Sequence, residues 1–434
     1  MTQVEVRLEL PSGPRTVGHL LDADRRIHFE YAPEFLAAGL PLSPFKLPLQ
    51  TGVFSDGLPE FHGLYGLFFD SLPDGWGLML MHRRMRKSGI DPNRISVLAW
   101  LRYVGARAMG ALSYHPADAP DLEEPMDVAL KTLASEAVAV FEGKTDRLLP
   151  ELEAAGSSPG GARPKAVVAL GPQDRVLVGA DVLPPGFEHW LVKFPAKGDL
   201  EDAGGLEETY ARMARGAGLR MPDTRLLALD KRRRCFAAKR FDRQGSTRVH
   251  MHSIGGLLHA SHRLPSLDYD DLLAATGALT RSQAEVVEGF RRLCFNVLAC
   301  NRDDHVRNFS YLMSGTGEWR FSPAYDLIYS EGMRGHHTTS VGGETLAPTQ
   351  DHVLGLGDKH GLSRKEALAV IDQVRSSVGD FRRLARGLSV ASKTVNQVTR
   401  RLEEVATRFG GARRATRAPA SGRRSGPARP RRPR

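Results

Sequence analysis

An apolar helix that runs directly into a dense polar loop is the feature that most limits how this chain can fold. Over residues 281–300, apolar side chains recur at the i, i+4, i+7 and i+8 spacing of one helix face: Val286, Phe290, Leu293, Cys294, Val297 and Leu298. Thr280 and Gln283 have the spacing of a capping box at its start. The next residues, NRDDHVRN at 301–308, contain two carboxylates, a histidine and an amide. The pattern predicts a buried helix that supports a polar, functional loop.

The N-terminal quarter of the chain has its own pattern. Residues 1–115 begin with the alternating segments VEVRLEL and RIHFEY, which favour strands, and continue into a helix-forming segment, LPDGWGLMLMHRRMRKSG. The stretch at 116–126 is rich in proline and acidic residues, which is typical of a linker. We expect a small α+β domain followed by a linker.

The rest of the chain divides into a strand-rich part and a helix-rich part. Five segments in residues 127–245 favour strands, namely KAVVAL, RVLVGA, HWLVKFP, RLLALD and CFAAKRF. Residues 246–410 are mostly helical in pattern, and Ser363 and Glu366 form a second capping-box spacing. Strands followed by helices predict an α+β fold.

The positive charge of the chain is concentrated at its C-terminus. Residues 411–434 contain nine arginines and no acidic residue, and removing these nine charges from the formal total of +10 leaves +1. Such a Pro/Gly/Ala/Arg segment cannot build a core and is predicted to be disordered. The remainder lacks the basic excess of a nucleic-acid-binding domain. The tail contacts DNA or RNA in a complex, or has no role; both readings stay open.

The compartment is predicted from what the sequence lacks. Its three cysteines form no CxxC pair, and their odd number does not indicate a disulfide framework. The N-terminus does not resemble a signal peptide, and no apolar run approaches the ~18 residues of a membrane span. We expect a cytoplasmic protein without membrane contact.

The polar loop has the spacing of a kinase catalytic loop. Asp303 and Asn308 reproduce the D-x-x-x-x-N pattern, in which a carboxylate accepts the proton of the attacking hydroxyl and an amide oxygen binds magnesium. Asp326 follows a predicted hairpin with a turn at 315–317, where kinases place a second magnesium carboxylate. No glycine follows Asp326, so the DFG signature is absent. The alternatives are a solvated loop whose Asp and Asn cap turns, and a helix cap at Asp326.

A lysine inside a predicted strand is a candidate phosphate ligand. Lys193 lies in HWLVKFP, and burying its charge is costly unless it is paired. Glu207 and Glu208 begin the following helix segment and are candidate partners, of which Glu207 is preferred. The alternative is a lysine that protects an edge strand from aggregation.

The glycine-rich segment GSSPGGARPKAVVAL precedes that strand. Gly160 and Gly161 allow a bent loop whose backbone approaches phosphate closely. The segment also matches the G-x-S-x-G pattern of serine hydrolases around Ser158, but Pro159 lacks the N–H that an oxyanion hole requires. The hydrolase reading is therefore disfavoured.

The histidines near the loop differ in what they indicate. His336 and His337 lack the spacing of a metal site. His305 lies inside the polar loop, where it contacts nucleotide phosphate or stabilises the loop.

The order of these motifs is that of a kinase, and together they resemble the HipA family of toxin serine/threonine kinases. The matching segments are GLYGLFFDSLPDGWG, SPGGARPKA, WLVKFP, KRFDR, DDHVRNFSYL and SPAYDLIYS. The resemblance implies a protein-kinase-like domain at 127–410, with a mixed N-lobe sheet and a helical C-lobe, behind a small N-terminal α+β domain.

The family resemblance also implies a role for each matching residue. Asp303 is implied as catalytic base, Asn308 and Asp326 as ligands of Mg²⁺, and Ser158 as a site of autophosphorylation that disables the phosphate loop. The residues implied to contact ATP are Lys193, Gly160, Gly161, Ala162, Lys239, Phe241 and His305. Two departures stand out, since many members have lysine at Arg307 and glutamate at Lys239.

Partners are implied by the same resemblance. An antitoxin with a helix-turn-helix fold (HipB-like) would dock on the kinase, so that contact with DNA is indirect. The protein substrate would be a translation component such as an aminoacyl-tRNA synthetase. Two other hypotheses remain: a non-catalytic co-repressor on a kinase scaffold, and a kinase for a small molecule.

Overall fold

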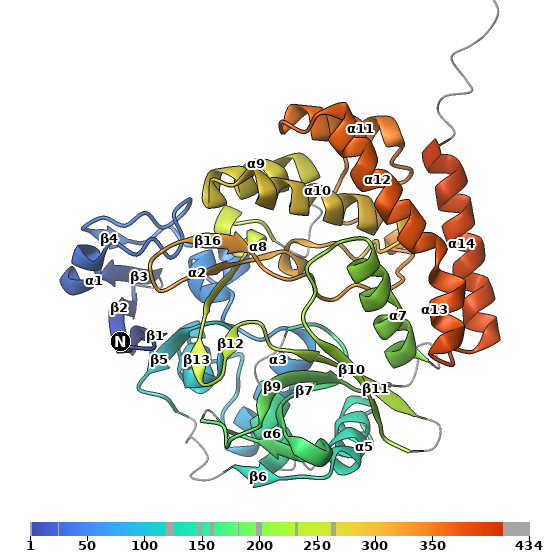
Figure 1. Cartoon of the computed structure of the whole chain (residues 1–434). Coiled ribbons are helices and arrows are strands. Elements are labelled where there is room, and N and C mark those ends of the chain that lie inside the picture. The colour runs from blue at the N-terminus through green and yellow to red at the C-terminus, as the bar shows by residue number, and fades with distance from the viewer. Residues whose placement is uncertain are drawn as a thin grey trace, which may run out of the picture.

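Residues 2–24, 26–118, 125–145, 150–156, 160–180, 182–196, 202–230, 233–261 and 266–410 are described by the computed structural model. Ser158 and the predicted disordered tail at 411–434 lie outside the described residues. The described residues form three sheets of three or more strands, flanked by helices (Figure 1).

The N-terminal part is built on an antiparallel sheet with strand order β4-β3-β2-β1-β5. Its strands are β1 (Thr2–Leu10), β2 (Gly13–Ala23), β3 (Arg26–Tyr31), β4 (Val53–Phe54) and β5 (Leu112–His115). Val4, Val6 and Leu8 alternate along β1 and are fully buried, which is why VEVRLEL forms a strand with one face on the core. The helical segments are α1 (Pro33–Ala38), η1 (Pro59–Phe61), α2 (Gly66–Phe69), α3 (Gly75–Lys87), α4 (Val97–Val104) and η2 (Gly105–Arg107).

The second sheet has the order β10-β11-β9-β7-β8-β6. Its strands are β6 (Met126–Asp127), β7 (Lys165–Leu170), β8 (Val176–Val178), β9 (Glu188–Lys193), β10 (Thr224–Ala228) and β11 (Arg234–Lys239). The accompanying helical segments are α5 (Leu130–Phe141), α6 (Pro150–Gly156), η3 (Pro172–Asp174) and α7 (Ala203–Gly216). Trp76 and Leu80 of α3 are buried in the same apolar cluster as this sheet. A helix of the N-terminal part therefore packs on this second sheet.

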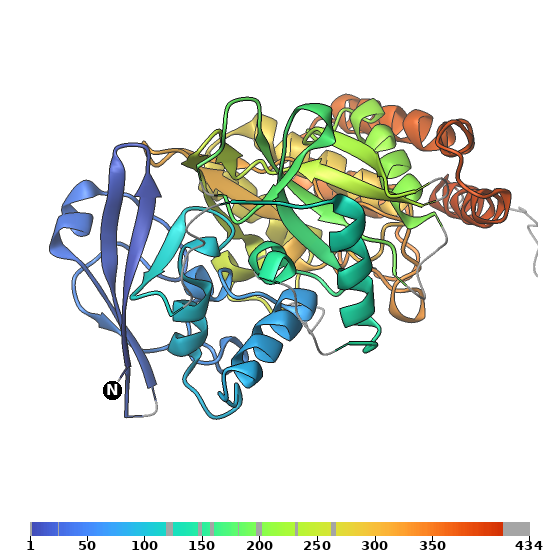
Figure 2. The same ribbon diagram turned by 90° about the horizontal axis from the view of Figure 1, so that it is seen from below.

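The C-terminal part is mainly helical and surrounds a small sheet of order β14-β15-β16. Its strands, with the separate pair β12 and β13, are β12 (Arg243–Gln244), β13 (Thr247–Arg248), β14 (His250–Ser253), β15 (Ser310–Met313) and β16 (Trp319–Phe321). Its helical segments are α8 (Ile254–Leu258), α9 (Tyr269–Thr280), α10 (Gln283–Leu298), η4 (Val306–Asn308), η5 (Met333–Gly335), α11 (Gln350–Lys359), α12 (Arg364–Gly379), α13 (Phe381–Gly387) and α14 (Ser392–Gly410). Figure 2 shows α13 and α14 at the end of the molecule farthest from the N-terminal sheet.

One of the two predicted capping boxes is confirmed and the other is wrong. Ser363 and Glu366 exchange the expected bonds at the start of α12. Thr280 instead is the last residue of α9, and its hydroxyl donates to the carbonyl of Thr276 at 2.7 Å. Ser282 is the residue that precedes α10, without a side-chain cap. Helix α10 therefore starts two residues later than the capping pattern indicated, because a tight turn separates it from α9.

The N-terminal part meets the C-terminal part through two glycines. A Cβ on Gly66 of α2 would collide with the backbone carbonyl of Gly256 in α8. The N–H of Gly66 donates to Nε2 of His259 at 3.1 Å, which fixes the contact. This close backbone approach requires glycine at position 66.

We predict that Gly66→Ala destabilises the protein by about 1–3 kcal/mol, because the added methyl must force α2 and α8 apart. The matched control is Gly355→Ala, in the exposed interior of α11, where an added Cβ meets nothing within 4 Å. That change should stabilise the protein by about 0.5–1 kcal/mol through helix propensity. Urea unfolding measures both, and equal effects of the two substitutions would refute the close packing of α2 on α8.

Candidate active site

The polar loop after α10 closes on itself. The Nδ2 of Asn308 donates to the backbone carbonyl of Asp303 at 2.7 Å, so the two ends of the D-x-x-x-x-N segment are tied together. Within the segment, Nδ1 of His305 accepts from the N–H of Arg307 at 3.2 Å. The bond from Asn308 uses its nitrogen and leaves its side-chain oxygen as the atom suited to a metal.

The two adjacent carboxylates of the loop have different surroundings. Asp304 is fully buried and accepts hydrogen bonds from the Tyr269 hydroxyl and from His337 Nδ1, both at 2.9 Å, and from the N–H of Thr338 at 2.9 Å. It therefore anchors the loop to α9 and to the segment around 337–339. Asp303 is exposed at the edge of the cleft.

The surroundings of Asp303 favour a proton acceptor. The cleft walls partly desolvate Asp303 and raise its pKa; His305 opposes this shift, and the negative charge of Asp326 adds to it. A carboxylate with a raised pKa is a better general base.

Lys193 is paired with two carboxylates from different parts of the fold. Its Nζ donates to Glu207 Oε1 at 2.6 Å and to Asp326 Oδ1 at 2.5 Å. Burial alone would lower the pKa of Lys193, but these two charges outweigh burial and raise it. Lys193 in turn holds the pKa of Asp326 well below its usual range, although burial opposes the shift. Burial raises the pKa of Glu207.

Several alternatives from the sequence are excluded by this arrangement. Strand β9 lies between β11 and β7, so Lys193 is not on an edge strand. Glu208 pairs with Arg212 at 2.8 Å rather than with Lys193, as the preference for Glu207 predicted. Asp326 caps no helix; it has a left-handed backbone with φ 55° in a non-helical segment after β16.

Lys165 is a site residue that the sequence reasoning missed. It is the direct register partner of Lys193 on β7, it is 4% exposed, and its Nζ donates to the carbonyl of Gly160. Burial lowers the pKa of Lys165, an effect that the charge of Asp326 opposes. A lysine at the first position of a strand, directly after a glycine-rich loop, was the signal that could have identified it.

The glycine-rich loop is held against the N-terminal part of the chain. Gly161 has φ 94°, and its N–H donates to Oδ1 of Asp74. A Cβ at Gly161 would collide with Nζ of Lys165. The backbone conformation therefore favours glycine here, and a larger residue would also have to displace the end of the Lys165 side chain.

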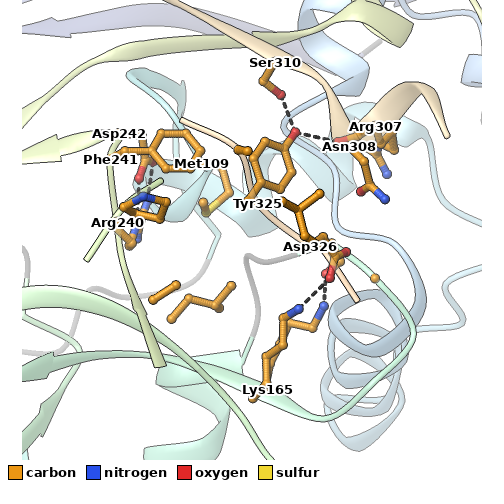
Figure 3. A pocket seen from close by; sticks show the side chains of 18 of the residues that line it. Met109, Lys165, Arg240, Phe241, Asp242, Arg307, Asn308, Ser310, Tyr325 and Asp326 are labelled. Atoms are coloured by element: carbon orange, nitrogen blue, oxygen red, sulfur yellow. Dashed lines mark hydrogen bonds and ion pairs between the residues drawn. The ribbon is translucent and has the colours of Figure 1, made fainter. Parts of the chain in front are cut away.

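Two adjoining pockets contain these groups. The first is a cavity of about 190 Å³ (Figure 3). One end of this cavity is charged and contains Lys165, Lys193 and Asp326, and its other end is apolar. The apolar end is lined by Met109, Leu191, Met221, Phe236, Ala238, Phe241, Tyr325 and Leu327. A more open pocket of about 640 Å³ shares Lys165, Lys193 and Asp326 with it and reaches Asp303.

Nearly all predicted site residues are brought together by these pockets. The first cavity is lined by Gly160, Gly161, Lys193, Glu207, Lys239, Phe241, His305, Asn308 and Asp326, and the second also by Ala162 and Asp303. Lys239 forms an ion pair with Glu188 at 2.5 Å, and the ring of Phe241 lies 5.6 Å from that of Tyr325. Ser158 alone among the predicted residues lies outside the described part of the chain.

The site offers oxygen donors of the kind that Mg²⁺ prefers. Asp326 is held ionised by Lys193, and Asn308 presents an amide oxygen. Among the described residues, no three His, Cys, Asp or Glu side chains gather as a metal site. Mg²⁺ usually binds one or two protein groups and takes its other ligands from phosphates and water, so these residues fit that ion.

A two-lobed α+β fold with a charged cleft between a sheet and a helical lobe defines a protein-kinase-like class. The chain belongs to the HipA family: the HipA N-terminal domain matches residues 10–115, and the HipA-like C-terminal domain matches residues 157–381. The predicted fold class and family are confirmed.

One curated protein and one solved structure are similar to this chain. The chain is 26% identical over 364 residues to "Putative kinase Y4dM" of Sinorhizobium fredii, covering 76% of this chain and 80% of the relative. The structure of a Shewanella oneidensis toxin–antitoxin complex of HipA, HipB and operator DNA is similar in fold, with a TM-score of 0.68 at 16% identity. That match covers 94% of this chain and 96% of the other.

Within the described ranges, no helix combines the length and the apolar character needed to cross a bilayer.

We predict that Lys193→Met lowers the free energy of unfolding by about 3–5 kcal/mol, because it leaves Glu207 buried without its cation. Glu207 already has a raised pKa, so the folded variant takes up a proton more readily than the unfolded chain. The loss should therefore be full near pH 8 and shrink as the pH falls toward 5. Urea unfolding at several pH values measures this change.

The control for this prediction is Lys359→Met, which removes an exposed ion pair with Asp270 and should leave stability unchanged. The double variant Lys193→Met with Glu207→Gln should recover part of the lost stability. If Lys193→Met and Lys359→Met changed the free energy of unfolding equally at every pH, the buried ion pair would not contribute to stability.

Proposed function

We propose that the protein is an ATP- and Mg²⁺-dependent serine/threonine protein kinase that acts as the toxin of a toxin–antitoxin module. The observation that carries the proposal is the pairing of Lys193 with Glu207 and Asp326 beside Asp303, since phosphoryl transfer needs these groups together. The HipA family membership and the kinase-like fold support the same reaction class.

The apolar end of the cavity suits a nucleotide base. Met109 and Phe241 line one part of it, and Leu191, Phe236 and Tyr325 also border the space. An adenine would bind between these apolar side chains, because a planar base gains stability by leaving water for such a slot. Lys193 and Lys165 lie at the other end of the same cavity, where they would neutralise the phosphates.

The transfer step follows from the positions of the remaining groups. The acceptor hydroxyl would enter through the more open pocket, and Asp303 would accept its proton as the oxygen forms a bond to the γ-phosphorus. The bond from that phosphorus to the ADP oxygen breaks, and its electron pair leaves with ADP. Asp326 and Asn308 would hold Mg²⁺, which when bound neutralises phosphate charge.

The partner and the substrate belong to the proposal as well. The similar Shewanella complex contains HipB and operator DNA, which supports a HipB-like antitoxin that connects this kinase to DNA indirectly. A translation component such as an aminoacyl-tRNA synthetase is the proposed substrate, on the family resemblance. We propose that phosphorylation of Ser158 inactivates the enzyme, because a phosphate in the glycine-rich loop would repel those of ATP.

We predict that Asp303→Asn abolishes phosphate transfer, with a loss of at least about 10²-fold, because an amide cannot accept the proton. Intact-mass spectrometry after incubation with Mg-ATP is the measurement. The starting protein is first treated with a phosphatase. The wild-type chain should gain one phosphate, mapped to Ser158, and the variant should gain none.

The matched control is Asp351→Asn, on the exposed face of α11, which should behave as wild type. Unfolding curves and ATP binding should be unchanged in Asp303→Asn, because the residue is exposed and the substitution keeps the size of its side chain. A variant that still labels itself at the wild-type rate would exclude Asp303 as the base. A wild type that binds no nucleotide would favour a non-catalytic scaffold.

A further inference from the structure

Asp74 of the N-terminal part touches both loops of the candidate active site. Its Oδ2 accepts from Nη1 of Arg307 at 2.6 Å, across a separation of 233 residues in sequence, and its Oδ1 accepts from the N–H of Gly161. Arg307 lies between Asp303 and Asn308 in the catalytic loop, and Gly161 lies in the glycine-rich loop. One carboxylate thus joins three segments that are distant in sequence.

This use of Asp74 is unusual for its position. Asp74 directly precedes α3, where an aspartate ordinarily accepts from the free N–H groups of the first helical turn. Here its side chain makes no such capping bond. Both carboxylate oxygens are directed instead to the two loops, although a capping bond would stabilise the helix by about 1 kcal/mol.

The neighbours of Asp74 reinforce the contact with the glycine-rich loop. The N–H of Trp76 donates to the carbonyl of Gly161 at 3.0 Å, and the indole Nε1 of Trp76 donates to the carbonyl of Lys165 at 2.8 Å. A Cβ on Gly75 would lie 2.6 Å from the carbonyl oxygen of Gly161. The start of α3 is therefore fitted closely to the loop that approaches phosphate.

The contact with the catalytic loop is reinforced from the other side. Nη2 of Arg307 donates to the carbonyls of Phe69 at 3.3 Å and Leu72 at 3.2 Å. Its guanidinium carbon lies 5.1 Å from the centre of the Phe69 ring. Arg307 and Asp74 are only 14% and 22% exposed as side chains, so solvent screens their ion pair weakly.

We propose that Asp74 is a positioning residue that holds the glycine-rich loop and the catalytic loop in one fixed arrangement, so that the N-terminal domain is a working part of the kinase site. The inference deepens the proposed function and rests on it for the catalytic consequence. Loosening Asp74 would release Gly161 from the phosphates and Arg307 from the loop that carries Asp303. Nucleotide binding and transfer would then weaken together.

The first test is hydrogen exchange of the full chain without nucleotide, comparing wild type with Asp74→Asn. An asparagine keeps the shape of Asp74 but loses the charge that faces Arg307. Exchange should rise at least severalfold in two separate segments, 160–165 and 303–308. The control Asp118→Asn removes a surface ion pair with Arg102 of α4 in the N-terminal part and should leave both segments unchanged. A rise in only one segment, or in neither, would overturn the inference.

The second test is the double-mutant cycle of Asp74→Asn with Arg307→Gln, read as kcat and KM for ATP. Each single variant should lower kcat/KM by about tenfold or more, with both constants affected, and the double variant should lose no more than the worse single variant. Losses that multiply would show independent roles and overturn the inference. If Asp74→Asn did not fold, Arg307→Gln would break the same pair from the other side and permit the exchange comparison.

The two tests separate the inference from the proposed function. Hydrogen exchange needs neither ATP nor phosphate transfer, so it judges the positioning role by itself. Two loosened segments in Asp74→Asn, together with a wild type that transfers no phosphate, would uphold the positioning role and refute the proposed kinase activity. Unchanged hydrogen exchange in Asp74→Asn, together with a wild type that transfers phosphate, would refute the positioning role and support the proposed kinase activity.

Discussion

The rest of the site depends on the ion pairs that the ammonium group of Lys193 forms with Glu207 and Asp326. A buried charge is tolerated only when its partners are in place, and here the partners come from α7 and from the segment after β16. The strand, the helix and the segment that carries Asp326 must therefore assemble together. This requirement ties the sheet to the helical lobe at the point where the pocket lies.

The N-terminal part of the chain also contributes residues to the site. It supplies Asp74 to the ion pair with Arg307, Trp76 to the glycine-rich loop and Met109 to the apolar end of the cavity. The charged centre is thus surrounded by groups from three regions of the sequence. Electrostatic placement of this kind contributes most of the catalysis in phosphoryl transfer, because the protein has little covalent chemistry to perform.

Local patterns in the sequence were sufficient for many of the elements and for much of the site. The lysine in the β9 strand, the preference for Glu207 and the D-x-x-x-x-N loop followed from spacing and from the cost of burying charge. The role of Asp74 could not be predicted, because its partner Arg307 is 233 residues away and the position before a helix suggests a cap. The capping box predicted at Thr280 was wrong for a related reason. The spacing of a capping box does not show that the preceding helix, α9, extends to that residue.

The most direct test of the account is calorimetric titration of the full chain with a non-hydrolysable ATP analogue, with and without Mg²⁺. The account predicts one nucleotide per chain, with affinity at least about tenfold weaker when Mg²⁺ is removed, because the phosphates then face Asp326 without the divalent ion that would bridge them. Absence of binding in both conditions, with folded protein, would contradict the assignment of this cleft as a nucleotide site.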